Sequence, residues 1–247
     1  MGIGTKSGIM ALAGAGSDFA NTYSLDFDGT DDFVTTGTGN LAFNRTTPFS
    51  ISLWIKMHAS ELTMIIGKGY PGGDYFGYLI WTNSSGGKNT LNCRVRKNGS
   101  HFVQFESTST FNLNQWYHVV MTYDGSGANT GLKLYVNGNN ESGTRSGTLG
   151  QDINYFPDIP FNIGARNNGN LPFNGLIDEV GIFDSELSST NVTNIYNSGT
   201  PASLSSLNPV SWWRFEEGSG TTATDSGTNG LDGTIANGTA YSTDVPS

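Results

Sequence analysis

The feature that most constrains the fold is a succession of short segments in which apolar and polar residues alternate. The clearest is Phe49–Met57, where Ile51, Leu53, Ile55 and Met57 share one face. Such period-two spacing is typical of a β-strand with one face in a core. Further strands are predicted at 23–27, 33–36, 62–66, 75–81, 90–96, 102–106, 115–123, 132–136, 161–164 and 175–183. Turn residues separate these segments, which predicts a sandwich of two antiparallel sheets.

Two local motifs refine this prediction. Asn137-Gly138 follows an apolar strand and is a strong signal for a tight hairpin turn. The segment 187–197 has apolar residues at helical spacing, with Ser188 as a candidate cap and Gly199 as a candidate stop. The fold class is therefore predicted to be all-β, with one short helix in the C-terminal third.

The charge balance limits the classes of partner. Charged residues make up 13% of the chain, well below the usual share of about a quarter, and the net charge is −9. A phosphate backbone calls for a basic patch, so we expect no nucleic-acid partner. No apolar run approaches the roughly 18 residues of a membrane helix, and we expect no membrane partner. Cys93 is the single cysteine, so the fold has no internal disulfide and the thiol is expected to be buried.

The strand at 175–183 has a carboxylate in an apolar row. Leu176, Val180 and Ile182 are expected on one face, with Asp178 among them. An unpaired buried charge is very costly, so Asp178 needs hydrogen-bond donors, a cation or a metal.

An acidic turn offers a second group of carboxylates. Asp28, Asp31 and Asp32 lie close together around Gly29 and can turn several oxygens toward one point. Calcium takes six to eight oxygen ligands and tolerates irregular loops, so the turn is a candidate structural calcium site. The alternative is a plain Asx-turn, with Asp178 bonded to backbone amides.

The carboxylates do not predict an enzyme. Glycoside hydrolysis needs two carboxyl groups that face one bond, but Asp178 and Glu179 are adjacent and would point to opposite faces of a strand. The same holds for Glu216 and Glu217. His118 shares a strand face with apolar residues, which favours packing over a catalytic base. We therefore predict a non-catalytic protein.

Sugar binding is harder to exclude, because aromatic and amide side chains gather near predicted loops. Aromatic rings hold sugars by stacking, and amide or charged groups bind the hydroxyls. The candidate ligand-binding residues are Tyr75, Tyr78, Trp81, Tyr155, Arg166 and Asn167. The alternative for each aromatic residue is packing in the core or at its rim.

The first residues differ in composition from the rest. Residues 1–21 are rich in Gly and Ala and have no stable periodicity, which predicts either a flexible arm or an anchor that orders against a neighbouring subunit or assembly. They lack the pattern of a secretory signal, which argues against ordinary secretion but not against release inside a particle. Residues 22–247 are expected to form a single domain.

Five motifs in order carry a resemblance to a known family. They are Leu25-Asp26-Phe27-Asp28-Gly29-Thr30-Asp31-Asp32-Phe33-Val34, Phe49-Ser50-Ile51-Ser52-Leu53-Trp54-Ile55, Trp116-Tyr117-His118-Val119, Leu132-Lys133-Leu134-Tyr135-Val136-Asn137-Gly138 and Phe173-Asn174-Gly175-Leu176-Ile177-Asp178-Glu179-Val180. Over roughly 21–200 the chain resembles the laminin-G-like, or concanavalin A-like, jelly rolls. The resemblance implies a two-sheet antiparallel jelly-roll sandwich. It also implies that Asp28, Asp31 and Asp178 surround one calcium ion.

The C-terminal part departs from that resemblance. Its motif is Trp213-Arg214-Phe215-Glu216-Glu217-Gly218-Ser219-Gly220, with Asp225-Ser226 and Asn229-Gly230-Leu231-Asp232-Gly233 behind it. This segment resembles the opening of the family's domain but stands last, so 208–247 is expected to supply a circularly permuted strand segment. The last strand would lie beside the strand near Tyr23, or in the same place in a neighbouring copy.

The permuted order and the Gly-rich start are similar to structural proteins of marine bacteriophages. That resemblance implies a jelly-roll module on a virion surface, with glycans as possible ligands. It also implies a homo-oligomer, or contact with other virion proteins through the N-terminal arm. The alternatives are a free extracellular carbohydrate-binding or adhesion domain from a bacterium and, third, a lectin-fold glycoside hydrolase.

Overall fold

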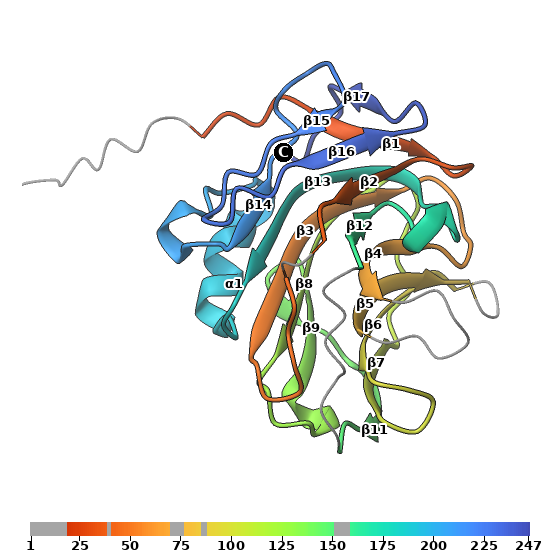
Figure 1. The fold of residues 1–247 in the computed structure, drawn as a ribbon, viewed down its shortest axis with the longest axis vertical. Coiled ribbons are helices and arrows are strands. Elements are labelled where there is room, and N and C mark those ends of the chain that lie inside the picture. The colour runs from red at the N-terminus through yellow and green to blue at the C-terminus, as the bar shows by residue number, and fades with distance from the viewer. Residues whose placement is uncertain (1–18, 39–40, 70–76, 85–87, 151–158) are drawn as a thin grey trace, which may run out of the picture.

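The chain forms a β-sandwich in a computed structural model that describes residues 19–38, 41–69, 77–84, 88–150 and 159–247. Two antiparallel sheets face each other across one main core (Figure 1). The sheet that carries the helix α1 (Ser189–Tyr196) lies on the left of that view, and the second sheet lies on the right. The predicted all-β jelly-roll sandwich with one short helix is confirmed for the described residues.

The first sheet has eight strands in the order β10-β9-β8-β3-β13-β1-β17, with β14 paired to β13. The strands are β1 (Ser24–Asp28), β3 (Phe49–Met57), β8 (Trp116–Tyr123), β9 (Leu132–Val136), β10 (Asn139–Asn140), β13 (Asn174–Phe183), β14 (Ser211–Trp213) and β17 (Ala240–Ser242). The long strands β3 and β13 lie side by side at its centre. This sheet is called the eight-stranded sheet below.

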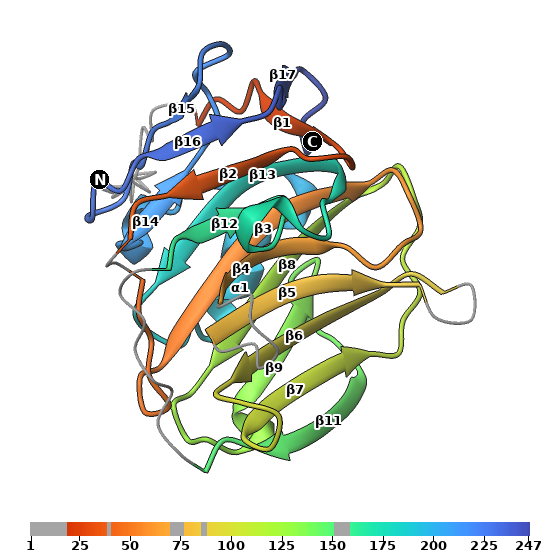
Figure 2. The same cartoon turned by 45° about the vertical axis from the view of Figure 1, so that its right-hand side comes forward.

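The second sheet has nine strands in the order β11-β7-β6-β5-β4-β12-β2-β16-β15, and Figure 2 shows it from its outer side. The strands are β2 (Phe33–Thr36), β4 (Met64–Gly69), β5 (Gly77–Asn83), β6 (Thr90–Arg96), β7 (Phe102–Ser107), β11 (Gly143–Thr148), β12 (Phe161–Ile163), β15 (Thr222–Ala223) and β16 (Gly233–Ala236). It is called the nine-stranded sheet below.

The core lies between the sheets and is built by the predicted alternation. Ile51, Leu53 and Ile55 of β3 are fully buried in it. Burying a large apolar side chain stabilises the fold by about 1.5–3 kcal/mol. The opposite face of β3 is also covered, because Ser52 and Trp54 are buried beneath α1 and the C-terminal segment.

The helix α1 covers the outer face of the eight-stranded sheet. Ser188 caps it, since its Oγ accepts a hydrogen bond from the backbone N–H of Asn191 at 3.1 Å. Asn197 ends it in a left-handed conformation, one residue earlier than the predicted boundary and without the predicted stop at Gly199. Short 3-10 helices lie at η2 (Asn129–Gly131), η3 (Asn167–Gly169), η4 (Asn197–Gly199) and η5 (Ser205–Leu207).

The C-terminal segment completes both sheets. β17 pairs with β1, and β16 pairs with β2. β14 pairs with β13, which places Trp213 in the main core. The last strand therefore lies beside the strand near Tyr23 in the same chain, as the sequence analysis expects. That this order is a permutation of the family's own order stays a prediction.

Residues 19–22 lie against the same C-terminal segment. Phe19 stacks on Trp212, with ring centroids 5.9 Å apart, and the backbone N–H of Thr22 donates to Glu216 at 2.8 Å. The prediction of a flexible arm at 1–21 therefore does not hold for 19–21. Residues 1–18 lie outside the described residues, so their part of that prediction stays untested.

Several local predictions have clear outcomes. Asn137 and Gly138 have φ values of 49° and 77° in the turn between β9 and β10, which confirms the predicted hairpin. Cys93 is buried, as expected. The strands β10 and β11 were not predicted, and the predicted C-terminal strand segment at 208–247 contains the four strands β14 to β17. No helix in the described ranges has both the length and the apolar character that spanning a bilayer requires.

Candidate functional site

The outer face of the nine-stranded sheet has an aromatic and basic surface at β5 and β6. Alternation along β5 turns Tyr78 and Ile80 into the core and leaves Leu79 and Trp81 on the outer face. Arg94 lies directly opposite Leu79 on β6, and Gln104 of β7 lies opposite Arg94. Figure 2 shows the strands β5, β6 and β7, which carry these residues, side by side in the sheet.

A pocket of about 380 Å³ opens on this face. It is lined by Leu62, Met64, Leu79, Trp81, Arg94, Arg166 and Leu171. Leu62 is an exposed large apolar residue, at 49% of its full accessibility. Arg166 and Leu171 come from the loop around η3, which the backbone closes by the hydrogen bond from the Arg166 N–H to the Asn170 carbonyl at 2.9 Å. We call these seven residues the Trp81 pocket.

Arg94 makes both ring contacts and hydrogen bonds within the Trp81 pocket. Its guanidinium carbon lies 5.1 Å from the ring centroid of Trp81 and 5.3 Å from that of Phe102. Its Nε and Nη2 both donate to Oε1 of Gln104, and Nε2 of Gln104 donates to Glu106. Burial, with the nearby Arg96, lowers the pKa of Arg94 from its usual high value. The hydrogen bonds to Gln104 and the contacts with two aromatic rings hold the guanidinium in one position.

Three of the predicted ligand-binding residues meet here. Trp81 and Arg166 line the Trp81 pocket, and Asn167 lines a small adjoining pocket with Arg166 and Met64. Tyr78 does not belong to this site, because it is 2% exposed in the core and its hydroxyl donates to the Leu41 carbonyl at 2.8 Å. The prediction for Tyr78 is therefore wrong, and the alternative of core packing holds.

Two further predicted ligand residues, Tyr75 and Tyr155, lie outside the described residues, and their prediction stays untested. Five residues of the Trp81 pocket were not predicted, namely Leu62, Met64, Leu79, Arg94 and Leu171. Arg94 occupies an outward position of β6 opposite Leu79, so strand alternation plus a correct pairing would have identified it.

The acidic turn brings its carboxylates together. Asp28, Asp31 and Asp32 each place one carboxylate oxygen within 4.8 Å of the others. The Asp28 Oδ1 accepts from the Thr30 N–H at 2.7 Å, and the Asp32 Oδ2 accepts from the Asp28 N–H at 3.0 Å. The predicted Asx-turn is thus present, and it shapes the carboxylate cluster rather than replacing it.

The residues of this turn fit a calcium ion. Asp32 is 3% exposed, and its Oδ1 has no hydrogen-bond partner among the described residues. Burial raises the pKa of Asp32, and the charges of Asp28 and Asp31 add to this shift, while hydrogen bonds from the Asp28 N–H and the Thr239 side chain oppose it. An oxygen-binding cation would satisfy this atom, while Asp28 and Asp31 supply the outer ligands.

Asp178 lies too far from the acidic turn to share that ion. Asp28 pairs with Asn174 on β13, and Asp178 stands four residues further along the strand. At about 3.3 Å per residue this places the two residues about 13 Å apart. This distance contradicts the expectation that Asp28, Asp31 and Asp178 surround one calcium ion; the carboxylate that clusters with those of Asp28 and Asp31 is that of Asp32.

A β-bulge explains the actual position of Asp178. The register of β13 against β3 shifts between Asp178 and Gly181, and Glu179 has a φ of 50°. The extra residue turns Ile177 and Val180 into the main core, so Asp178 is not in their row. The predicted face shared by Asp178, Val180 and Ile182 is wrong for this reason.

The bulge also places Asp178 and Glu179 on the same side of the sheet. The Asp178 Oδ1 accepts from the Glu179 N–H at 2.8 Å, and its Oδ2 accepts from the Asn21 Nδ2 at 2.9 Å. The Trp212 Nε1 donates to Glu179 at 2.6 Å, and the Arg214 Nε donates to it at 3.3 Å. The expectation that these carboxylates point to opposite faces is therefore wrong.

The pair lies beneath the N-terminal segment. Arg214 stacks 4.4 Å from the Phe19 ring centroid and donates to the Ala20 carbonyl. Burial raises the pKa of Glu179 to about 8, and burial together with the charge of Glu179 raises the pKa of Asp178 well above its usual range. Asp178 and Glu179 are 0% and 3% exposed, so a sugar has no access to either carboxyl group.

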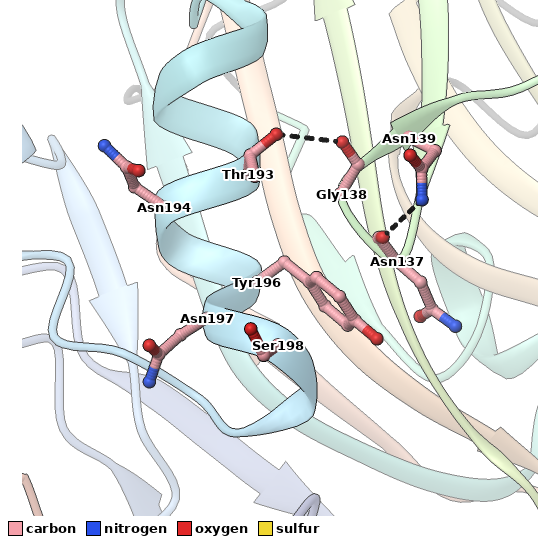
Figure 3. Close-up of a pocket in the computed structure, with 8 residues that line it drawn as sticks. All are labelled: Asn137, Gly138, Asn139, Thr193, Asn194, Tyr196, Asn197 and Ser198. Carbon is pink, nitrogen blue, oxygen red and sulfur yellow. Dashed lines mark hydrogen bonds between the residues drawn. The ribbon is translucent and has the colours of Figure 1, made fainter.

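A second pocket lies on the opposite side of the molecule, between α1 and the β9–β10 hairpin (Figure 3). Its volume is about 530 Å³, and it is lined by Asn137, Gly138, Asn139, Thr193, Asn194, Tyr196, Asn197 and Ser198. Figure 3 shows the Tyr196 ring directed toward the hairpin, while Asn194 and Asn197 point away from it. The Thr193 hydroxyl already donates to the Gly138 carbonyl at 3.1 Å.

His118 lies beneath this second pocket and serves packing. Its Nε2 is 2.9 Å from the Ser52 hydroxyl, and its ring packs against those of Trp54 and Tyr196. Burial lowers the pKa of His118 to about 3, so the ring stays neutral. This agrees with the predicted packing role.

Comparisons with known proteins place this fold among jelly-roll domains. The adhesion G-protein coupled receptor V1 of Danio rerio is 25% identical over 171 residues, which are 68% of this chain but 3% of that receptor. A candidate carbohydrate-binding protein from Bacteroides ovatus has a TM-score of 0.62 at 20% identity, over 91% of this chain and 61% of that one. The chain thus spans less than two thirds of either protein.

A smaller neighbour and the family match complete the comparison. Domain 4 of an extracellular arabinanase from Geobacillus stearothermophilus, solved with arabinotriose, has a TM-score of 0.52 at 23% identity, over 70% of this chain and 76% of that one. At these identities both structures show a shared fold. Residues 28–193, about two thirds of the chain, match a laminin G family, so the chain belongs to the concanavalin A-like lectin/glucanases superfamily.

Proposed function

We propose that the protein is a non-catalytic carbohydrate-binding module whose ligand site is the Trp81 pocket. The observation that carries the proposal is a tryptophan ring on an outer sheet face, flanked by Arg94, Arg166, the exposed Leu62 and the half-buried Leu79. Sugars present an apolar ring face together with hydroxyl groups, and aromatic rings with nearby donors recognise both.

The fold neighbours support this proposal. One is a candidate carbohydrate-binding protein, and another was solved with arabinotriose. The second pocket in Figure 3 is the weaker candidate, because two of its side chains already donate hydrogen bonds within the protein. The Thr193 hydroxyl donates to the Gly138 carbonyl, and the Asn139 amide donates to the Asn137 carbonyl.

A glycan array with the full chain tests the proposal. We expect binding by the wild type and its loss in Trp81→Ala, while Tyr196→Ala, which alters the second pocket, binds as the wild type does. Aromatic stacking on one ring is worth about 0.5–1.5 kcal/mol beyond its buried area, which corresponds to a loss of about two- to tenfold in affinity, and the lost buried area adds to it. Unchanged binding by Trp81→Ala would reject this site.

Hydrolysis remains the less favoured activity. The Asp178–Glu179 pair has the required residue types, but both side chains are buried beneath residues 19–22 and Trp212. We therefore expect no turnover of arabinan or other glycans. Hydrolysis that Glu179→Gln abolishes would revive the enzyme alternative.

We also propose a structural calcium ion at Asp28, Asp31 and Asp32. The three carboxylates and the unpartnered Oδ1 of Asp32 support it. The ion would fasten the loop that follows β16 to the acidic turn, because the Asn237 Nδ2 donates to the Asp31 carbonyl at 2.9 Å.

The location proposal is a virion surface, with a free extracellular adhesion domain as the alternative. It rests on the resemblance, inferred from the sequence, of the expected permuted order and the Gly-rich start to structural proteins of marine bacteriophages. A homo-oligomer, or contact with other virion proteins, through the N-terminal arm is part of the same proposal. Mass spectrometry of purified particles tests the location, and finding the chain only as a free secreted monomer would favour the alternative.

A further inference from the structure

Residues 19–22, which we call the strap, lie over the buried carboxyl groups of Asp178 and Glu179. The strap belongs to no strand or helix, and it packs on the outer face of the eight-stranded sheet through Phe19. Its partners are side chains that lie far away in sequence. A short segment held by side-chain contacts opens at a lower cost in free energy than a strand paired within a sheet.

The first half of the strap is held by an aromatic and cationic contact. Phe19 stacks on Trp212, with the ring centroids 5.9 Å apart. The guanidinium carbon of Arg214 lies 4.4 Å from the Phe19 centroid, and the same side chain donates to the Ala20 carbonyl. These contacts cover Trp212, which is 4% exposed. Opening of the strap would therefore expose a large apolar ring.

The second half of the strap is held by carboxylates. The Asn21 Nδ2 donates to Oδ2 of Asp178 at 2.9 Å. Oε1 of Glu216 accepts from the backbone N–H groups of Thr22 at 2.8 Å and of Tyr23 at 3.2 Å. The strap is thus bonded directly to one member of the buried pair and to a neighbouring acid.

The charges beneath the strap do not balance when every carboxyl group is ionised. Asp178, Glu179 and Glu216 are three acids that act on one another, and Arg214 is the cation that pairs with Glu179 in the described contacts. Full ionisation would leave net negative charge in a site that water does not reach. Such a buried charge is costly, so the closed strap favours a pair that keeps a proton.

The neighbouring elements supply no further free cation among the described residues. On β3, the uncharged Trp54 lies opposite Asp178, and Lys56 is already paired with Asp244. On β1, the ionisable side chains are the acids Asp26 and Asp28. The strap and β14 contain no ionisable residue. The pair can therefore be neutralised within the closed site only by a proton.

The direction of the pH effect follows from proton binding in the two states. Burial raises the pKa of Glu179 to about 8, and burial with the charge of Glu179 raises the pKa of Asp178. With the strap open, water reaches both groups, and solvated carboxyl groups titrate near about 4. The open state thus binds fewer protons between these values, so a rising pH favours opening.

We propose that residues 19–22 are a proton-gated strap, which stays closed while the Asp178–Glu179 pair holds a proton and opens when both carboxyl groups are ionised. The proton leaves to solvent, and no covalent bond changes. Opening exposes Trp212 and frees the strap for contacts outside its own domain. Release of one proton raises the open fraction by at most about tenfold per pH unit. The device is separate from the Trp81 pocket, so it does not depend on the proposed function.

Hydrogen exchange of the full chain between pH 5 and pH 8 measures the opening. The backbone amides of Thr22 and Tyr23 are the reporters, because both donate to Glu216. Their protection factors, which correct each rate for the intrinsic effect of pH, should fall about 10- to 100-fold over this range. The control is the Thr224 amide, which donates to the Glu217 carboxylate at 2.8 Å and should keep its protection factor.

Variants separate the carboxyl pair from the other contacts of the strap. Asp178→Asn and Glu179→Gln should each reduce the pH dependence, and the double variant should remove it. Phe19→Ala should lower the protection factors of the reporters at every pH and keep their pH dependence, because it removes the ring contact alone. Glu61→Gln, which loses the same charge at an exposed position, should behave as the wild type does. Thermal melts verify that each variant is folded.

Three outcomes would overturn the proposal. Protection factors of the two reporter amides that stay constant from pH 5 to pH 8 in the wild type would show that the strap is not gated by a proton. An equal fall in the wild type and in the double variant would show that the carboxyl pair is not the gate. An equal fall at the Thr224 amide would assign the change to the whole domain instead of the strap.

Discussion

The buried pair Asp178–Glu179 should make the stability of the protein depend on pH in a diagnostic direction. Burial raises the pKa of Glu179 to about 8, whereas an unfolded glutamate titrates near 4.3. The folded protein therefore holds a proton that the unfolded chain has already released. The free energy of unfolding should fall as pH rises from about 4.5 to about 8.

The structure gives an upper limit to this effect. A difference of that size in pKa changes the free energy of unfolding by at most about 5 kcal/mol, reached when the pH spans both pKa values. Residues 19–22 cover the pair through Phe19 and Asn21, and lifting them admits water at lower cost than global unfolding. We therefore expect a loss of about 2 kcal/mol between pH 5 and pH 8, which lowers Tm by about 4–8 °C.

Urea unfolding of wild type and Glu179→Gln at pH 5, 6, 7 and 8 measures the effect. The variant cannot ionise at this position, so its unfolding free energy should change less over the range. Subtracting one curve from the other removes the contribution of the titratable groups that both proteins share. Glu61→Gln, at an exposed position, is the control. Parallel curves for wild type and Glu179→Gln would refute the reasoning.

Three further predictions follow from single contacts. Added calcium should raise the Tm of the wild type, and a chelator should reverse that rise. Asp32→Asn should abolish both effects. Thermal melts in which calcium does not shift the wild-type Tm would reject the proposed calcium site. Gly138→Ala should cost about 1–2 kcal/mol in urea unfolding, because a Cβ at φ 77° would lie 2.9 Å from the Tyr196 ring; a neutral result would contradict the turn geometry. Asp244→Asn should cost at most about 1 kcal/mol, since Lys56 and Trp116 donate hydrogen bonds to the Asp244 carboxylate at the surface. Proteolysis of the C-terminus should also accelerate, and unchanged cleavage would show that these contacts do not hold the C-terminus.

The strands could be predicted from the sequence because alternation is a local property. The boundaries of β2, β3 and β6 agree with the predicted segments to the residue. The hairpin at Asn137-Gly138 was equally local, since it depends on two residues that tolerate left-handed conformations.

The position of Asp178 could not be predicted in the same way. Period-two reasoning fails after a bulge, and the bulge at Glu179 depends on the pairing of β13 with β3. The donors that satisfy Asp178 and Glu179 come from Asn21, Trp212 and Arg214, which lie far away in sequence. Only the fold brings those residues together.

The candidate site was partly predictable for a related reason. Trp81 and Arg166 could be identified as aromatic and basic residues near loops. Arg94 gains its place only when β6 pairs with β5 in the observed register, and Tyr78 loses its place because its strand turns it inward. The residue types could be read from the sequence alone. The face of the sheet on which each side chain lies depended on how the strands pair.

The central claim is that a glycan binds on the Trp81 pocket, and the five tryptophans allow a direct test. The measurement is a ¹H–¹⁵N spectrum of the indole groups during titration with the tightest glycan from the array, with Trp81→Phe to assign one signal. We predict a saturable shift of the Trp81 indole, while the Trp54 indole, which packs on Tyr196 beneath the second pocket, stays in place. A shift of the Trp54 indole with an unmoved Trp81 indole would contradict the account.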